Sequence, residues 1–154
     1  MTAPPERSDR PILEVEGLSK TFVSRGLLGT SRPVKAVADV SFTVSRGEAI
    51  ALVGESGSGK STFARAVVGL QPASGGELEL LGIPLARRLE RRDREVIRRL
   101  QMVFQSSDEA LAPHRSVGAT LRRPFMRLAG LTRSEADARV AALLEAVQLG
   151  PGYA

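Results

Sequence analysis

The stretch Glu48-Ala-Ile-Ala-Leu-Val-Gly-Glu-Ser-Gly-Ser-Gly-Lys-Ser61 decides the fold of this chain. Residues 49–53 are apolar without alternation, which is typical of a strand buried on both faces of a parallel sheet. Glycines then punctuate residues 54–59, and apolar side chains recur at helical spacing over residues 61–70. Gly69 and Pro72 lie where such a helix would end. The sequence therefore predicts a strand, a glycine-rich turn and a helix, in that order.

The glycine-rich turn satisfies the spacing G-x-x-x-x-G-K-[ST] of a phosphate-binding loop. Glycines let backbone N–H groups turn inward at the start of a helix, where the helix dipole favours anions. Lys60 is expected to reach the β- and γ-phosphates, Ser61 to bind Mg²⁺ and Thr62 to donate to the α-phosphate. A structural turn with an incidental surface lysine is the alternative. The predicted nucleotide-binding residues here are Gly54, Glu55, Ser56, Gly57, Ser58, Gly59, Lys60, Ser61 and Thr62.

Composition excludes several classes of protein. The 154 residues are 42% hydrophobic and 25% charged, which is an ordinary globular balance. No window approaches the roughly 18 apolar residues of a membrane-spanning helix, and the N-terminus lacks the apolar core of a signal peptide. The chain has no cysteine and a single histidine, which excludes disulfides and thiolate metal sites and leaves little for zinc. A protein of the cytosol, or facing it, is expected.

The charge is basic, with 22 Lys and Arg against 17 Asp and Glu, giving a net charge of +5. Arginines are dense over residues 87–99, at spacings that allow ion pairs with acidic neighbours one helical turn away. A solvated helix face explains this segment, because no stacking aromatics are interleaved with the charges. No nucleic-acid partner is expected.

The rest of the chain predicts alternating strands and helices after a flexible leader at residues 1–11. Residues 12–23 and 37–44 form extended segments separated by a loop, and a turn at Ser45-Arg-Gly47 leads into the apolar strand. The later elements expected are a strand at 77–81, a helix at 89–100, a short strand at 101–105 and a helix at 117–128.

The last helix has the clearest local signature. Thr132-Arg-Ser-Glu135 is a capping box, in which the first and last side chains each satisfy an N–H group of the helix start. The residues after it form an apolar stripe at helical spacing, which predicts a face turned toward a neighbouring element. The stripe is Ala136, Val140, Leu143, Leu144 and Val147.

From Ile12 onward the chain resembles the ATPase subunits of ATP-binding cassette (ABC) transporters. The matching pieces are Leu18-Ser-Lys-Thr-Phe22, Ala36-Val-Ala-Asp-Val-Ser-Phe42, Arg46-Gly-Glu48, Leu52–Thr62 and Leu100-Gln-Met-Val-Phe-Gln105. The resemblance implies an α/β P-loop NTPase fold of the ABC type, bound to ATP and Mg²⁺. Residues 12–154 would be the N-terminal portion of one such domain: its antiparallel β part, the P-loop strand and helix, and the start of the helical subdomain.

The same resemblance assigns two further site residues. In the family, the aromatic residue matching Phe22 stacks on adenine, and the glutamine matching Gln105 contacts Mg²⁺ and the catalytic water. A flat ring suits a flat base, whereas an ordinary strand aromatic is the alternative for Phe22. Gln105 and Lys60 are thus the expected catalytic residues, and Gln105 and Ser61 the expected metal ligands.

Other parts of the family's catalytic machinery have no match in these residues. A Walker B strand, the Leu-Ser-Gly-Gly-Gln signature and a switch histidine are absent. Ser74-Gly-Gly-Glu77 looks like the signature but follows the P-loop helix directly, where the family has only a turn before a strand, so it is not the signature. His114 comes too early in the sequence to be the switch histidine. A truncated cassette that does not hydrolyse ATP alone is the expectation.

The insert at residues 25–29 and the stretch 101–124 resemble importers of oligopeptides, dipeptides or nickel, although Ser106-Ser-Asp-Glu-Ala-Leu-Ala-Pro113 departs from their pattern. The resemblance implies an ATP-binding subunit that energises import, with a second ABC ATPase subunit and membrane-spanning permease subunits as partners. It would lie in the cytoplasm, peripheral to the inner face of the cell membrane. A non-transport cassette of the DNA-repair or translation type, or a fragment that binds nucleotide without turnover, is the alternative.

Apolar residues of the stretch 105–128 suggest where the permease would dock. They exceed what a plain surface loop needs, so a groove for a partner helix is one hypothesis. Packing against the stripe of the last helix is the other. The residues are Leu111, Pro113, Val117, Leu121, Pro124, Phe125 and Met126.

Overall fold

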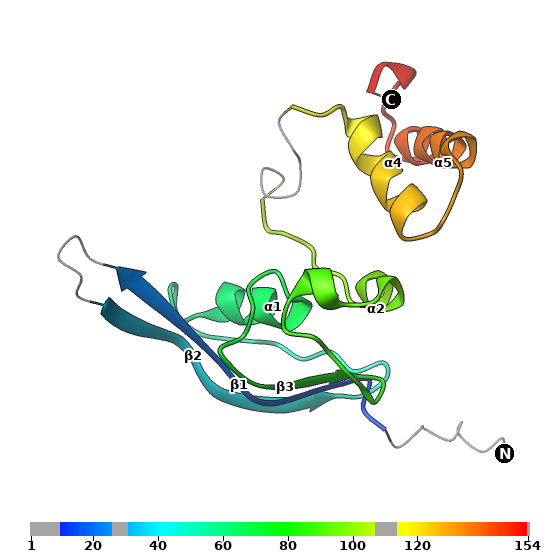
Figure 1. The fold of residues 1–154 in the computed structure, drawn as a ribbon. Coiled ribbons are helices and arrows are strands. Elements are labelled where there is room, and N and C mark those ends of the chain that lie inside the picture. Colours follow the sequence, from blue (N-terminus) through cyan, green and yellow to red (C-terminus); the bar gives the residue numbers. More distant parts are fainter. Residues whose placement is uncertain (1–9, 26–30, 107–113, 154) are drawn as a thin grey trace, which may run out of the picture. The chain divides into compact units, whose positions relative to one another are not determined.

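The structure, a computed structural model, describes residues 10–25, 31–106 and 114–153 (Figure 1). The chain divides into two compact units, Met1–Met102 and Val103–Ala154, which are described separately below. Nearly all of the expected leader, and residues 26–29 of the insert at 25–29, lie outside the described residues. No helix in the described parts of the chain has the length and hydropathy needed to cross a membrane.

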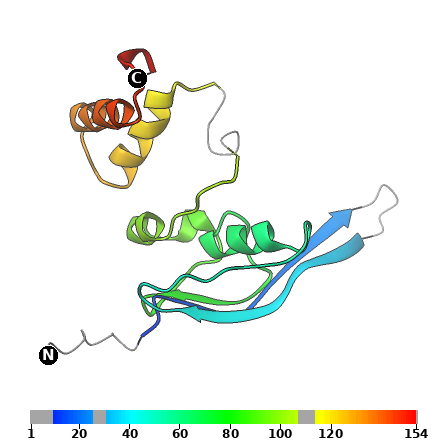
Figure 2. The same ribbon diagram turned by 180° about the vertical axis from the view of Figure 1, so that it is seen from behind.

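The first unit is built on an antiparallel sheet in the order β2-β1-β3-β4. The strands are β1 (Leu13–Arg25), β2 (Ser31–Val44), β3 (Gly75–Leu80) and β4 (Ile83–Pro84). Helices α1 (Lys60–Val68) and α2 (Arg94–Arg99) lie on one face of this sheet in both views (Figures 1 and 2). The strands predicted at 12–23 and 77–81 are confirmed, whereas β2 begins earlier than predicted and takes in part of the expected loop.

The core of this unit lies between α1 and the sheet. Alternation places Val15 on the covered face of β1, with Glu14 and Glu16 on the other, and β3 repeats the pattern. Phe63 of α1 approaches Phe42 of β2 with ring centroids 5.6 Å apart. The buried cluster comprises Val15, Leu18, Val37, Phe63, Ala66, Val67, Ala73 and Leu78.

Strands β1 and β3 approach each other closely where β3 begins. A Cβ atom at Gly76, where φ is +88°, would lie 2.6 Å from the carbonyl oxygens of Glu16 and Gly17. Only glycine allows the two backbones to approach so closely. The register between β1 and β3 shifts at this point, between Glu16 and Ser19.

The strand predicted at 48–53 does not form. The turn before it does form, with the Glu48 N–H donating to the Ser45 carbonyl at 3.1 Å, but the backbone that follows is irregular. Ile50, Leu52 and Val53 are 49%, 50% and 89% exposed. A strand requires a neighbour for its backbone hydrogen bonds, and no strand of the described residues pairs with this segment.

The short strand predicted at 101–105 is wrong for the same physical reason. Its backbone is irregular and Val103 is 94% exposed. The apolar pattern of such a segment indicates that it favours burial in a sheet, but a strand forms only where neighbouring strands are present.

The single helix predicted at 89–100 is divided in two. A 3₁₀ turn, η1 (Leu89–Arg91), is followed by extended backbone at Arg92 and Asp93 and then by α2. The break turns the Arg92 side chain inward, where its Nε donates to the Ala86 carbonyl at 2.7 Å and Nη1 to the Val67 carbonyl at 2.8 Å. Both hydrogen bonds are therefore made from the extended residue that separates η1 from α2.

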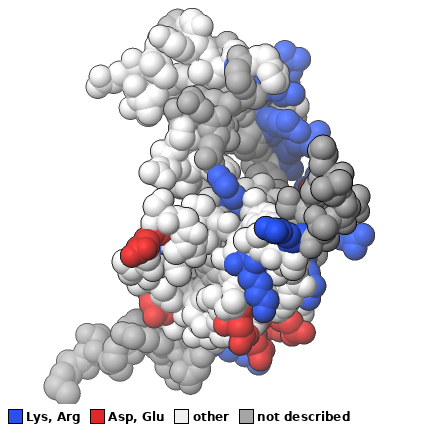
Figure 3. All heavy atoms as spheres, turned by 90° about the vertical axis from the view of Figure 1, so that its left-hand side faces the viewer, with Lys and Arg blue, Asp and Glu red and all other residues white. Residues whose placement is uncertain are grey.

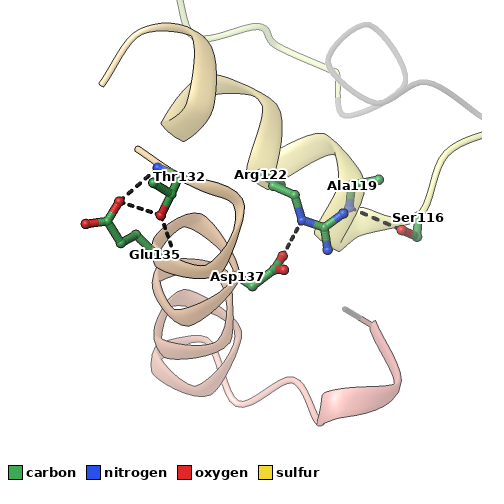
Figure 4. A network of polar contacts seen from close by, with 6 residues as sticks. All are labelled: Ser116, Ala119, Arg122, Thr132, Glu135 and Asp137. Carbon is green, nitrogen blue, oxygen red and sulfur yellow. Dashed lines mark hydrogen bonds and ion pairs between the residues drawn. The ribbon is translucent and has the colours of Figure 1, made fainter. Parts of the chain in front are cut away.

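The second unit is a pair of packed helices, α4 (Val117–Arg127) and α5 (Arg133–Ala146), followed by the short turn η2 (Pro151–Tyr153). The predicted capping box at Thr132 and Glu135 is present, and Arg122 of α4 forms an ion pair with Asp137 of α5 (Figure 4). Both predicted helices are therefore confirmed to within a residue or two.

The apolar stripe of α5 is only partly covered. Ala136, Val140 and Leu144 are buried, as predicted, whereas Leu143 and Val147 are 43% and 63% exposed. The prediction is wrong for these last two residues because, among the helices that the structure describes in this unit, α4 is the long one that packs on α5, and one neighbour covers a narrow face.

Candidate nucleotide-phosphate site

The glycine-rich loop wraps around the side chain of the lysine that follows it. Lys60 Nζ donates to the carbonyl oxygens of Gly54 at 2.8 Å and Glu55 at 2.7 Å, and to the Ser58 hydroxyl at 3.2 Å. The ammonium is thus held inside the curve of the loop. An incidental surface lysine would extend into solvent, so this geometry favours the phosphate site over a merely structural turn.

Gly59 fixes how the loop meets the sheet. Its φ of +94° is a conformation that favours glycine, and a Cβ atom there would lie 2.1 Å from the carbonyl oxygen of Ala36 on β2. No other residue type fits without moving the strand. The loop is therefore seated directly on β2, and Gly59 forms the N-cap of α1.

The N-terminus of α1 is suited to an anion. Gly59 provides no side-chain cap, and the first turn of the helix contains no acidic residue. The hydrogen bond from the Phe63 N–H to the Gly59 carbonyl, at 2.8 Å, starts the helical ladder, so the N–H groups of residues 60–62 precede that ladder. Helix dipole, first-turn N–H groups and the Lys60 charge all favour a phosphate at this end.

A cavity of about 370 Å³ lies where the loop faces β2. It is within the range of small-molecule sites, although at the lower end. The residues lining it that matter here are Lys35 and Ala36 of β2 and Gly54, Ser58 and Lys60 of the loop. Ser61 is exposed and Thr62 half-buried at the start of α1.

Phe22 lies on β1, in the same unit as the loop, and is 39% exposed. Lys20 Nζ lies 5.0 Å from the centroid of its ring. Sequence reasoning missed Lys20, although the signal was available: residues two apart on a strand point to the same face, so Lys20 and Phe22 were bound to be neighbours.

Gln105 belongs to the second unit and is exposed, just before the part of the chain that is not described. The structure brings the loop residues 54–62 together but does not test the role of Gln105 toward Mg²⁺ or water, which stays a prediction. Within the described ranges, no three His, Asp or Glu side chains gather in a way that could hold a metal ion.

Charge on the surface also favours an anionic ligand. In the lower part of Figure 3, a group of Asp and Glu side chains lies near the bottom edge, with Lys and Arg side chains next to it. The sequence carries a net charge of +5. Such a field raises the rate at which a phosphorylated ligand encounters the protein.

Residues 37–152 match the family model described as ABC transporter, so the chain belongs to the ABC transporter family. Among curated proteins it is 42% identical over 139 residues to the nickel import ATP-binding protein NikE of Shigella sonnei. It is 41% identical, over the same length, to the protein of that name from Escherichia coli K12. Each match covers 90% of this chain and 52% of the relative, so the chain spans about half the length of these relatives.

Solved structures agree on the fold. A dimeric bacterial ABC transporter cassette matches with a TM-score of 0.67 and 23% identity, over 92% of this chain and 60% of that one. A dimeric cassette in a post-hydrolysis state, bound to ADP and Pi, matches with a TM-score of 0.66 and 22% identity over the same shares. The predicted fold class is confirmed: an ABC cassette fold, α/β with an antiparallel sheet, present in part.

Proposed function

We propose that this chain binds ATP with Mg²⁺ through residues 54–62. The observation that carries the proposal is the position of Lys60, whose ammonium is enclosed by its own loop beside the uncapped start of α1. A phosphate oxygen can replace the loop carbonyls as the partner of the ammonium, and charge-assisted contacts of this kind are among the stronger hydrogen bonds.

The roles within the site follow from chemistry. Loop N–H groups and Lys60 hold the phosphate chain, Ser61 offers its hydroxyl to Mg²⁺, and Thr62 donates to the α-phosphate. Mg²⁺, when bound, neutralises charge that develops on the phosphate oxygens. Phe22 offers a ring face to adenine, and Gln105 is the proposed contact to Mg²⁺ and the attacking water.

The experiment that tests ATP binding compares ligands with and without phosphates. Isothermal titration of the 154-residue chain with MgATP, MgADP and adenosine should show affinity falling in that order. A phosphate site predicts that adenosine binds far more weakly than either nucleotide, because the P-loop contributes nothing to it. Equal affinity for adenosine and MgATP would contradict the proposal.

We further propose that the longer protein energises import in the manner of the relatives named for nickel import. The 41–42% identity over 90% of this chain supports that branch of the family. Transport of nickel complexes or small peptides, pairing with a second ABC ATPase subunit, contact with membrane-spanning permease subunits and a place at the inner face of the cell membrane all belong to this proposal.

Hydrolysis is proposed to need more than these 154 residues. Phosphoryl transfer depends on positioning and on charge stabilisation around the γ-phosphate, and no Walker B carboxylate is present in this sequence. The chain alone should therefore release phosphate no faster than its Lys60→Ala variant. Release well above that control, in protein free of contaminating ATPases, would contradict the proposal.

The permease contact is proposed to involve α4 and the residues just before it. Val117, Leu121 and Phe125 are half-buried in the unit that α4 forms with α5, which supports internal packing for these three residues. Leu111 and Pro113 lie outside the described residues. Met126 of α4 is 40% exposed and therefore open to a partner.

Cross-linking tests this contact in the full-length protein. These 154 residues contain no native cysteine, so a single cysteine introduced at Arg115 or Met126 would be the only thiol in this part of the protein. Both should cross-link to permease subunits, whereas a control cysteine at Glu16 on the outer face of the sheet should not. Silence at both positions with transport intact would count against this docking surface.

A further inference from the structure

Lys20 makes two contacts that neither the loop nor the family resemblance accounts for. Its ammonium donates to the Pro72 carbonyl oxygen at 2.7 Å, across 52 positions of sequence. The same nitrogen lies 5.0 Å from the centroid of the Phe22 ring. Lys20 therefore links the strand that carries the aromatic ring to the segment that follows α1, which ends at Val68.

We propose that Lys20 is a positioning residue for base recognition, holding the Phe22 ring from one face so that the other face can stack on a purine. This inference rests on the proposed binding of ATP. A cation over an aromatic face is attracted by the quadrupole of the ring, and the hydrogen bond to Pro72 keeps the cation in place. The ring is thereby oriented before the base arrives.

Exposure and strand pairing agree with a ring that is supported from one side. Phe22 is 39% exposed, and its cross-strand partner on β2 is Val34, itself 59% exposed. Neither residue is packed into the core cluster. Without Lys20, the ring would lose its fixed support and would have to be ordered by the base itself, which costs affinity.

Other hydrogen bonds hold the same strand segment in place. The Ser74 N–H donates to the Ser19 carbonyl at 2.8 Å, and the Thr21 N–H donates to the Ser74 hydroxyl at 3.0 Å. These contacts use backbone and Ser74 atoms, not Lys20. Replacing Lys20 should therefore leave β1 attached to the segment after α1, and the variant should fold.

The test distinguishes recognition of the base from recognition of the phosphate chain. Mg-tripolyphosphate carries the phosphate chain without a base, so it reports on the loop alone. We expect Lys20→Met to weaken MgATP about three- to tenfold and to leave Mg-tripolyphosphate unchanged. Lys20→Arg should restore MgATP affinity, because a guanidinium can donate to Pro72 and lie over the ring.

A double variant shows whether Lys20 acts through the ring. In a Phe22→Ala background, adding Lys20→Met should have no further effect on MgATP affinity. The inference is overturned if Lys20→Met leaves MgATP affinity unchanged, if it weakens both ligands equally, or if its effect persists without the ring. Failure of the proposed function looks different: the unmodified chain would then bind neither MgATP nor Mg-tripolyphosphate.

Discussion

Arg92 shows how a single side chain can decide local structure. It is 8% exposed, and burial lowers the pKa of its guanidinium from the ordinary value of an arginine. Its two hydrogen bonds, to carbonyls of Val67 and Ala86, join the end of α1 to the segment before η1. Gly69 leaves room for it, because a Cβ there would lie 3.1 Å from the guanidinium.

Replacing Arg92 should destabilise the first unit. Arg92→Met keeps much of the side-chain volume but leaves the Val67 and Ala86 carbonyls without their donor. We expect the free energy of unfolding to fall by about 1.5–3 kcal/mol, as for hydrogen bonds to charged groups.

Urea denaturation measures this change, and Arg91→Met is the matched control, since Arg91 is exposed in the adjacent position. The control should change stability by less than about 0.5 kcal/mol. Equal free energies of unfolding for the two variants would show that the buried guanidinium makes no net contribution to stability.

At the scale of elements, the sequence predicted best where the signal is local. The capping box at Thr132 and Glu135, the glycine that ends α1 and the alternation of β1 all depend on neighbours within a few residues. The break in the helix predicted at 89–100 depends instead on Val67, which is 25 positions away from Arg92. Spacing along the chain carries no information on such a contact.

The capping box predicts a specific dependence on pH. Glu135 accepts hydrogen bonds from the Thr132 hydroxyl at 2.6 Å and from the Thr132 N–H at 2.8 Å. These bonds lower the pKa of the Glu135 carboxyl. A lowered pKa in the folded state means that the stabilisation is present above the ordinary value, about 4.3, and is lost as the pH falls through the folded-state pKa.

We therefore expect the start of α5 to loosen in acid. Amide hydrogen exchange at Glu135 and Ala136 can be followed by NMR from neutral pH downward and corrected for the intrinsic pH dependence of exchange. Protection should decline as the pH falls below the ordinary pKa of a glutamate. In Glu135→Gln, which cannot titrate, this decline should be smaller. The same decline in both proteins would exclude the carboxyl as its cause.

At the scale of the whole molecule, the apolar pattern at 48–53 leads to a strand only where neighbouring strands are present to pair with it. Its apolar run predicted burial on both faces, yet the described residues provide no parallel strand to pair with it. The glycine-rich turn and the helix that follows it were predicted more completely than the sheet, because both depend on residues close together in sequence; the ligand roles of residues 54–62 stay a prediction. The alternation of a strand places Lys20 beside Phe22, but its contact with Pro72 is 52 positions away and could not be predicted from spacing.

Exposed apolar surface should make the isolated chain self-associate. Ile50 and Leu52 line an apolar cavity of about 380 Å³ beside α1, and both are about half exposed. Sedimentation velocity over a concentration series should show association, and the double variant Ile50→Thr, Leu52→Thr should raise the monomer fraction. Ile83→Thr on β4, at 55% exposed in the unmodified chain, is the control and should change little. A chain that is monomeric throughout and melts cooperatively would contradict this expectation.

The measurement that tests the account most directly is the affinity of the Lys60→Ala variant for MgATP. Lys60 supplies the side-chain charge inside the loop, so its removal should weaken MgATP binding by about ten- to a hundredfold. Arg98→Ala, which removes an exposed charge on α2, should bind as the unmodified chain does. Unchanged affinity in a folded Lys60→Ala variant would contradict the assignment of this loop as the phosphate site.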